Sequence, residues 1–384
     1  MKDKKKIMVF IDWYVPGFKA GGPIRSVFNI VCALKEDYNF FILTSAYDLG
    51  DTEPYKEIEL NRWMDEDGVL IKYLDKDHIK NAVIKHNVDE INPDMLYVNG
   101  IFSRYFSILP IRIGKAKKIK TIVAPRGMFG EGALDVKRFK KNLFLKYTSL
   151  TNMFEDVIWH ASSPFEAKDI QSKVAKINRI VIAGNIPSVQ KSSYSKLSKL
   201  KTYDQIKLVF VGRLNKIKNI DKVIEWVCHV QYGKKIILDI YGGGDDIEFT
   251  KYLQNISTSN NHLEINFKGF IPPDQVNKIL PKYHYFISLS SNENFGHSIA
   301  ESLSNAVPVI ISKNTPWRNL QDKGIGWDIE IEKELFLNTL QDAIGIDPIA
   351  YNKMAENAYN FFNQEILNQS LLESNKSLFE DEGN

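Results

Sequence analysis

Two glutamates eight positions apart, Glu293 and Glu301, are the most informative chemical feature of this sequence. Glu293 lies in a polar stretch after an apolar run, and Glu301 lies just inside a helical pattern. Gly296 between them lets a ligand approach the backbone closely. A helix start also offers free N–H groups and a partial positive charge to an anion. The spacing predicts two carboxylates and an anion-binding helix end at one place, although a surface helix with scattered acids has the same pattern.

Two cations form the second feature. Arg213 and Lys218 follow the apolar run 208–212 and precede another helical pattern. Arginine offers a planar fork to phosphate oxygens, and lysine offers a mobile point charge. Two such cations at the end of a strand could neutralise a diphosphate without a metal ion. Taken alone, the pair could equally be solvated surface charge.

A glycine-rich turn is the third feature. Gly21 and Gly22 precede Pro23, which suits the first position of a helix, and Arg25 lies in its first turn. Backbone N–H groups of such a turn can cradle phosphate. The turn matches neither the dinucleotide fingerprint nor the P-loop pattern, so alone it is a weak signal.

The elements that must position these residues alternate along the whole chain. Short runs rich in Val, Ile, Phe and Tyr are separated by segments of helical length, which predicts parallel sheets covered by helices on both faces. We expect an N-terminal Rossmann-like domain over residues 1–186 and a Ser- and Lys-rich linker over 187–205. A second Rossmann-like domain should cover 206–355, and a helical segment over 356–384 should pack back toward the first domain.

Composition restricts the class of protein further. The chain has 384 residues, 44% of them apolar and 25% charged, as expected of an ordinary two-domain globular protein. Residues 1–186 carry 29 basic and 23 acidic side chains, net +6, within an overall charge of +3. No run approaches the roughly 18 apolar residues that span a bilayer. The apolar run after the basic N-terminus is also too short for a signal peptide. We therefore expect a cytoplasmic protein.

Together, the three features resemble the family 4 glycosyltransferases. Glu293 and Glu301 match the E-x7-E pair of that family, Arg213 and Lys218 match its G-R-L-x-x-x-K motif, and Gly21-Gly22 match its glycine loop. The resemblance implies the GT-B fold, an α/β fold in which two doubly wound Rossmann-like domains face a central cleft. It also implies a retaining glycosyltransferase of hexosyl or N-acetylhexosaminyl type.

The same resemblance implies roles for individual residues. Arg213 and Lys218 would hold the donor diphosphate, Glu301 the ribose, and Glu293 the donor sugar. The remaining donor-binding residues would be Asn294, Phe295, Gly296, His297, Ser298, Gly21, Gly22, Gly242 and Phe270. Glu293, Arg213 and Lys218 would be the catalytic set. No metal ion and no cofactor are expected, because the nucleotide-sugar is a substrate.

Several positions differ from the commonest family pattern. Asn294 stands where glycine is usual, His297 where an apolar residue is usual, and residues 314–318 replace a Gly-Gly loop. These differences resemble the subgroup that builds bacterial surface polysaccharides (capsule, O-antigen or exopolysaccharide). On the acceptor side the candidates are Arg126, Arg25 and His160, although His160 could instead be a structural histidine.

A basic amphipathic segment covers residues 134–147. Apolar residues recur there at helical spacing among lysines and an arginine, so the segment could lie on an anionic membrane surface or pack on the core with a solvated basic side. The first alternative suits a lipid-linked or glycan acceptor at the inner face of the plasma membrane. Nucleic-acid binding is not expected, because no known nucleic-acid module is present.

Two other functions remain open at this point. Nucleotide-sugar epimerases share the architecture, but they require acid and base groups at a sugar carbon. A non-catalytic nucleotide-sugar-binding protein would need the same donor site without turnover.

Overall fold

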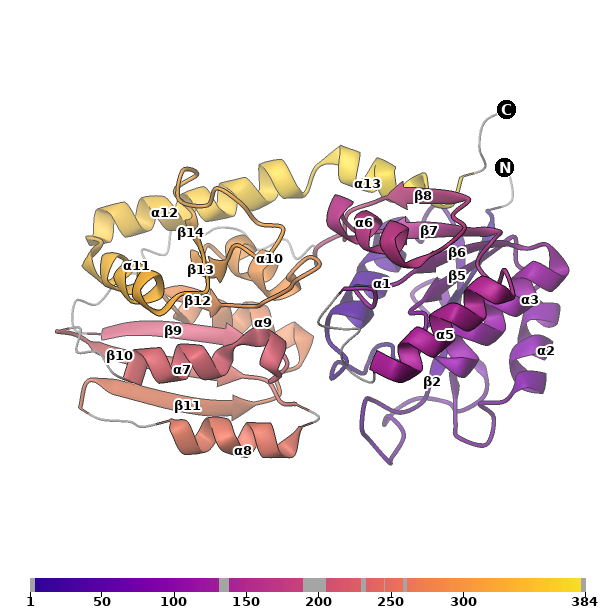
Figure 1. Cartoon of the computed structure of the whole chain (residues 1–384), viewed down its shortest axis with the longest axis horizontal. Coiled ribbons are helices and arrows are strands. Elements are labelled where there is room, and N and C mark those ends of the chain that lie inside the picture. The colour runs from indigo at the N-terminus through magenta and orange to yellow at the C-terminus, as the bar shows by residue number, and fades with distance from the viewer. Residues whose placement is uncertain are drawn as a thin grey trace. The chain divides into compact units, whose positions relative to one another are not determined.

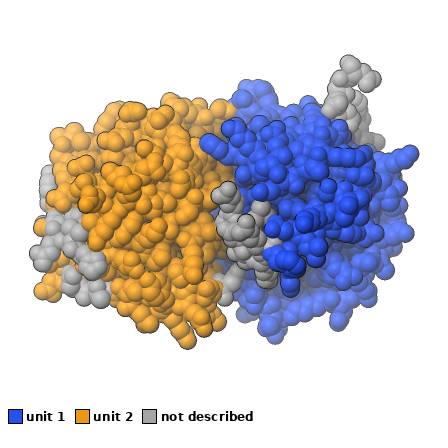
Figure 2. All heavy atoms as spheres, viewed as in Figure 1, with its two compact units in different colours: residues 1–186, 369–384 blue, residues 187–368 orange. Residues whose placement is uncertain are grey.

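The computed structural model describes residues 4–130, 138–188, 205–228, 233–244, 246–257 and 261–380. The chain forms two compact units. Unit 1 comprises residues 1–186 together with 369–384, and unit 2 comprises residues 187–368 (Figure 2). Each unit contains its own sheet and its own cores, so each is described separately.

Unit 1 is built on an eight-stranded sheet in the order β3-β4-β2-β1-β5-β6-β7-β8 (Figure 1). All neighbouring strands are parallel except β3, which pairs antiparallel with β4 at one edge. The strands are β1 Lys6–Phe10, β2 Asn39–Ser45, β3 Trp63–Glu66, β4 Val69–Leu74, β5 Met95–Asn99, β6 Lys120–Ala124, β7 Val157–Ala161 and β8 Arg179–Ile182.

Helices cover both faces of this sheet because alternate strand residues point to opposite sides. Ile7 and Val9 pack with α1, whereas Met8 and Phe10 pack with α2 and α3. The residues after α13 join the α1 face. The helical elements of unit 1 are α1 Gly22–Leu34, α2 Asn81–Ile91, η1 Arg104–Ile108, α3 Leu109–Lys117, α5 Arg138–Leu150, α6 Pro164–Lys173 and α13 Gln369–Lys376.

Unit 2 has a six-stranded, fully parallel sheet in the order β11-β10-β9-β12-β13-β14. Its strands are β9 Gln205–Val211, β10 Lys235–Tyr241, β11 Leu263–Gly269, β12 Tyr285–Ser288, β13 Val309–Ser312 and β14 Gly326–Ile329. The order reverses direction between β9 and β12. In doubly wound sheets such a switch point marks the edge where ligands bind, outside the carboxyl ends of the strands.

Two cores sandwich the second sheet as well. Leu208 and Phe210 pack with α7, α8 and α11, and Val209 packs with α9, α10 and α12. The helical elements are η2 Lys216–Lys218, α7 Ile220–Cys228, α8 Ile247–Ile256, α9 Pro273–Ile279, η3 Leu280–Lys282, α10 His297–Ser304, α11 Lys333–Gly345, α12 Pro348–Phe361 and η4 Phe362–Ile366.

The expected fold class, two doubly wound α/β domains, is confirmed. The pattern of apolar runs does not reveal strands β3, β4 and β14, which are short or carry polar residues among the apolar ones. Most of the expected linker, residues 189–204, lies outside the described residues. Residue 356 falls inside α12 of unit 2, whereas residues 369–384 belong to unit 1. Among the helices that the structure describes, none is long and apolar enough to cross a membrane.

Candidate active site

Asn219 joins the loop after β9 to the loop after β12 in unit 2. It adopts a left-handed conformation, with φ of 48°, and is almost fully buried. Its amide Nδ2 donates to the carbonyl of Leu289 and to the hydroxyl of Ser291, both at 2.7 Å. The N–H of Ser291 donates in return to the carbonyl of Ile217 at 2.7 Å. These bonds hold the loop of Arg213 and Lys218 against the loop of Glu293.

Lys218 and Glu293 form an ion pair across the switch point. The ammonium of Lys218 contacts Oε2 of Glu293, and each side chain is only 19% exposed. Asn215 fixes the start of η2 by accepting from the N–H of Lys218 at 3.2 Å. The N–H of Glu293 donates to the carbonyl of Asn314, in the loop after β13, at 3.2 Å. The structure thus brings together two charged residues that lie 75 positions apart in the sequence.

The start of α10 lies next to Glu293. Gly296 has a φ of 80°, and a Cβ added there would meet Ile299 at 2.7 Å and Cγ of Glu293 at 3.2 Å. No side chain caps the helix and no acidic residue occupies its first turn. The partial positive charge of the helix end is therefore available to an anion. Glu301 is buried on the same helix, and Asn294 and Ser298 are partly buried.

Three aromatic residues pack together at the loop that precedes α10. Trp317 is buried in the loop after β13, and its indole N–H donates to the carbonyl of Phe295. The Phe295 ring lies 5.5 Å from the Trp317 ring and 4.9 Å from the His297 ring. Trp317 fixes the backbone between the two glutamates. The sequence shows an unusual loop over 314–318, but nothing in its pattern indicates this role for Trp317.

The loops after β10 and β11 contact the loop after β9. Gly242 has a φ of 145°, and a Cβ there would lie 1.8 Å from the carbonyl oxygen of Gly212. The N–H of Gly242 donates to Gly269 at 2.7 Å. Phe270 lies over Gly243, where a Cβ would meet its ring at 2.4 Å. Only glycines allow these three loops to approach so closely.

Arg213 differs from Lys218 in having no side-chain partner among the residues that the structure describes. Its side chain is exposed directly after β9 and forms no ion pair or hydrogen bond with any residue in the described part of the chain. Five loops of unit 2 thus gather Arg213, Lys218, Glu293, the start of α10 and Phe270 at one edge of the sheet. The other expected site residues, Gly21, Gly22, Arg25, Arg126 and His160, lie in unit 1.

The glycine turn of unit 1 precedes α1. Asp48, which follows β2 and is buried, accepts from the N–H groups of Phe18 and Lys19 at 2.8 and 3.1 Å. Gly21 has a φ of 71°, and nothing lies within 4 Å of the position of a Cβ there. The helix starts at Gly22 with no side-chain cap and no acid in its first turn. Arg25 is partly buried on this helix.

His160 lies inside unit 1 and is only 1% exposed. Its Nε2 lies 2.9 Å from the carbonyl of Ala183, and its Nδ1 lies 2.8 Å from the hydroxyl of Tyr97. Because a carbonyl only accepts, Nε2 carries the proton and Nδ1 accepts from Tyr97. Burial, with the nearby Arg126 charge, lowers the pKa of His160 to about 3. His160 is therefore a neutral residue that orients Tyr97.

Asp12, which the sequence analysis assigned no role, lies just after β1. Its Oδ1 accepts from the hydroxyl of Ser103 at 2.6 Å. Burial raises the pKa of this carboxyl to about 6, against the lowering effect of the Ser103 hydrogen bond. The sequence does contain a signal for Asp12, because an acidic residue directly after an apolar strand lies at the edge of the sheet where ligands bind.

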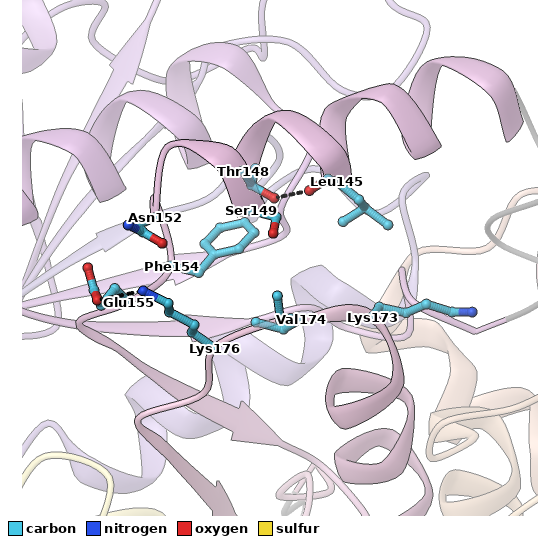
Figure 3. A pocket seen from close by; sticks show the side chains of 10 residues that line it. Leu145, Thr148, Ser149, Asn152, Phe154, Glu155, Lys173, Val174 and Lys176 are labelled. Carbon is cyan, nitrogen blue, oxygen red and sulfur yellow. Dashed lines mark hydrogen bonds and ion pairs between the residues drawn. The ribbon is translucent and has the colours of Figure 1, made fainter.

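A separate recess lies between the end of α5 and the end of α6, lined by Thr148, Phe154 and Val174 (Figure 3). Its volume is about 20 Å³, which is enough for a water molecule but not for a sugar. In the described part of the chain, no group of three His, Cys, Asp or Glu side chains could hold a metal ion.

Comparison with known proteins relates this geometry to a family. Residues 195–361 match the family model of glycosyl transferases group 1. No curated protein sequence matches the chain. Among solved structures, HepE from Anabaena in complex with UDP-glucose has a TM-score of 0.73 at 13% identity, covering 98% of this chain and 99% of HepE.

Two further structures share the fold. Sucrose-phosphate synthase from Thermosynechococcus elongatus has a TM-score of 0.69 at 14% identity, covering 98% of both chains. WaaG, a glycosyltransferase involved in lipopolysaccharide biosynthesis, has a TM-score of 0.66 at 13% identity, covering 97% of this chain and 98% of WaaG. The residues matched by the family model include the charged residues that unit 2 gathers at one edge of its sheet. Residues 195–361 therefore match a domain of the group 1 glycosyl transferases, and the chain as a whole has the GT-B fold of these solved structures.

Proposed function

We propose that this protein transfers a sugar from a nucleotide-diphosphate donor to a glycan or lipid-linked acceptor, with retention of anomeric configuration. The pathway would be the biosynthesis of a bacterial surface polysaccharide, at the cytoplasmic face of the membrane. The observation that carries the proposal is the gathering of Arg213, the Lys218–Glu293 pair and the uncapped start of α10 at the switch point of unit 2. A diphosphate attached to a sugar has the charge and the hydroxyl groups that such a set would bind.

Each group has a distinct task in this proposal. Arg213 and Lys218 bind the diphosphate together with the N–H groups at the start of α10. Glu293 accepts hydrogen bonds from the donor sugar, and Glu301 accepts them from the ribose. Phe270 and Gly242 lie beside the nucleotide, and Gly21-Gly22 of unit 1 provide further N–H groups for an anion.

The chemical step is the departure of a nucleoside diphosphate from the anomeric carbon. Negative charge increases on the departing phosphate, so groups that are already oriented toward it stabilise the transition state more than the ground state. Arg213 is the group best suited to this task, because no acidic side chain in the described part of the chain neutralises it. The acceptor hydroxyl then bonds to the anomeric carbon, and its proton passes to a phosphate oxygen of the leaving group.

The test is a transfer assay with a panel of nucleotide-sugars, beginning with UDP-glucose, for the wild type and Arg213→Ala. We expect the variant to lose roughly 10²–10³ in kcat, because removing one preorganised donor of this kind has that effect. Lys216→Ala is the matched control, since Lys216 is an exposed cation three positions away. Equal turnover by the wild type and Arg213→Ala would exclude the proposed role of Arg213.

We also propose that α5 contacts an anionic membrane surface. Phe139, Leu143, Tyr147 and Leu150 recur at helical spacing and are 81%, 60%, 47% and 85% exposed. Lys140 and Lys146 are exposed on the same helix. Residues 134–137 of the basic segment lie outside the described residues. An exposed apolar stripe flanked by lysines has the chemistry of an interfacial helix, which would bring the enzyme to a lipid-linked acceptor.

Vesicle flotation tests this contact. The wild type should float with vesicles containing anionic lipid at low salt and less at high salt, because both apolar burial and charge contribute. Replacing Phe139, Leu143 and Leu150 by serine should abolish flotation, whereas Ile247→Ser, at an exposed apolar position of unit 2, should not. Equal flotation of both variants, or none by the wild type, would contradict the contact.

A further inference from the structure

Arg126 is held in one orientation by three neutral partners in unit 1. Its Nε donates to Oδ1 of Asn99 at 3.0 Å, and its two terminal nitrogens donate to Oδ1 of Asn185 at 2.8 Å and to the hydroxyl of Tyr97 at 2.6 Å. These partners follow or belong to β5 and β8, and Arg126 follows β6. A guanidinium carries five N–H donors, so one N–H on each terminal nitrogen has no acceptor among the described residues.

No carboxylate in the described part of the chain forms an ion pair with this cation. Arg126 is partly buried and forms no ion pair with any residue that the structure describes. His160, behind Tyr97, is neutral and contributes no negative charge. The nearby carboxylate of Glu166 accepts instead from the N–H of Gly127 at 2.6 Å and from Ser162, whose N–H and hydroxyl lie at 2.8 and 2.6 Å. A partly buried charge without an ion-pair partner is costly unless a ligand supplies one.

The backbone at Arg126 is also in an unfavourable conformation. Its φ is 55°, and that of Gly127 is 78°. Left-handed conformations cost a non-glycine residue roughly 1–2 kcal/mol, and such strain concentrates at functional sites. The buried Glu166 holds this turn through the N–H of Gly127. The fold therefore maintains a strained backbone that orients a cation with two available donors.

We propose that Arg126 is the binding site for an anionic group, a phosphate or a carboxylate, carried by the acceptor. The proposal rests on the proposed glycosyltransferase function and adds to it the charge of the acceptor. The two remaining N–H groups of Arg126 would donate to the oxygens of the anion. The donor diphosphate already has its own cations and helix end on unit 2, whereas Arg126 lies in unit 1 with neutral hydrogen-bond partners. A neutral acceptor would leave this charge unpaired.

The test measures the melting temperature of the full chain with UDP at saturation, so that the donor site is occupied. Inorganic phosphate, glucuronate and glucose are titrated separately, and glucose is the neutral control for glucuronate. The variants are Arg126→Gln, Arg126→Lys and Arg112→Gln, the last at an exposed arginine of α3 in the same unit. UDP-glucose affinity is measured in parallel for each variant.

We expect phosphate or glucuronate, but not glucose, to raise the melting temperature of the wild type and of Arg112→Gln. Arg126→Gln should need about a ten- to hundredfold higher concentration of that anion for the same rise in melting temperature, as expected for losing a hydrogen bond to a charged group. Arg126→Lys should fall between, because lysine keeps the charge but not the fork. A response to phosphate alone indicates a phosphorylated acceptor, and a response to glucuronate alone indicates an acidic sugar.

Three results would overturn the proposal. The first is a wild type whose melting temperature changes with neither anion. This result would exclude the proposed site even if Arg126→Gln does not fold. The second is an unchanged response in Arg126→Gln. The third is a tenfold loss of UDP-glucose affinity in that variant with no anion response, which would assign Arg126 to the donor. The titration is repeated without UDP in the Arg213→Ala variant, in which binding of a diphosphate to the donor site should be weakened. An anion response in that variant then measures binding at Arg126 separately from binding at the donor site.

Discussion

At the scale of single residues, the ion pair between Lys218 and Glu293 connects the two halves of the proposed donor site. Lysine has three donors, so its ammonium can contact a carboxylate and a phosphate oxygen together. Glu293 therefore orients the cation, and the cation limits the repulsion between Glu293 and an incoming diphosphate. We therefore expect the effects of changing these two residues to be coupled.

A double-mutant cycle should reveal this coupling. We expect Lys218→Ala to weaken UDP-glucose binding strongly, because it removes a cation and also leaves Glu293 unpaired. Glu293→Gln should weaken binding less, and the double variant should bind better than the sum of the single losses implies, with a coupling of roughly 0.5–3 kcal/mol. The coupling is calculated from the dissociation constants of UDP-glucose for the wild type, the two single variants and the double variant, measured by calorimetry. Strictly additive losses would show that the two side chains act independently.

Asp12 gives a pH-dependent prediction. Its pKa is about 6 in the folded protein because of burial, above the ordinary value near 3.8. The folded state thus favours the protonated carboxyl, and stability from this group is lost as pH rises from about 4 through 6. Asp12→Asn should therefore stabilise the protein by an amount on the order of 2 kcal/mol at pH 8 and by nearly nothing at pH 4. Urea unfolding at both pH values measures the difference, and an equal effect at both would contradict the burial argument.

At the scale of elements, close contact between loops shapes the proposed donor site. Strands β9, β10 and β11 end side by side, and glycines let the loops that follow them touch. Asn219 and Trp317 then attach the loops after β12 and β13. The site is rigid on this side because hydrogen bonds connect each loop to its neighbour.

Two glycine variants separate loop contact from backbone strain. Gly242→Ala places a Cβ 1.8 Å from the oxygen of Gly212, whereas Gly269→Ala, at a φ of 72°, meets nothing within 4 Å. We expect Gly269→Ala to cost about 1–2 kcal/mol from strain alone. Gly242→Ala should cost roughly 2–4 kcal/mol and also weaken UDP-glucose binding. Unfolding and binding measurements on both variants test this, and equal effects would show that the close contact is unimportant.

At the scale of the whole molecule, unit 1 is completed by the far end of the chain. Leu378 and Phe379 are almost fully buried in the core beneath α1, with Phe379 against Tyr38, Phe40 and Tyr97. Asn375 donates to the carbonyl of Gly184 at 2.9 Å. The stability of unit 1 therefore depends on residues that follow all of unit 2 in the sequence.

Phe379→Ala tests this dependence. Removing a buried phenylalanine should cost about 3–5 kcal/mol, and the loss should fall on unit 1 because Phe379 packs there. UDP-glucose should still stabilise unit 2 in this variant. Ile349→Ala, at a position 83% exposed on α12, is the control and should change stability by less than about 0.5 kcal/mol. Normal stability of Phe379→Ala would show that the C-terminal residues are dispensable.

Much of the fold and part of the site could be predicted from the sequence. Buried parallel strands are nearly continuous apolar runs, so the central strands were visible, whereas the edge strand β3, with its two acidic residues, was not. The motif residues of unit 2 were found because strand ends and helix starts leave local signals. Trp317 and Asp12 were missed because their roles depend on partners 22 and 91 positions away.

The sequence by itself determined the class of fold, the resemblance to a glycosyltransferase family and which residues carry charge at strand ends, because apolar periodicity and motif spacing are local properties. Only the tertiary structure decided that Lys218 pairs with Glu293, that His160 is buried and neutral, that Arg126 has no acidic partner among the described residues, and that the apolar side chains of α5 are exposed. Each of these depends on distance and burial between segments far apart in the chain. Those quantities exist only once the sheets have assembled.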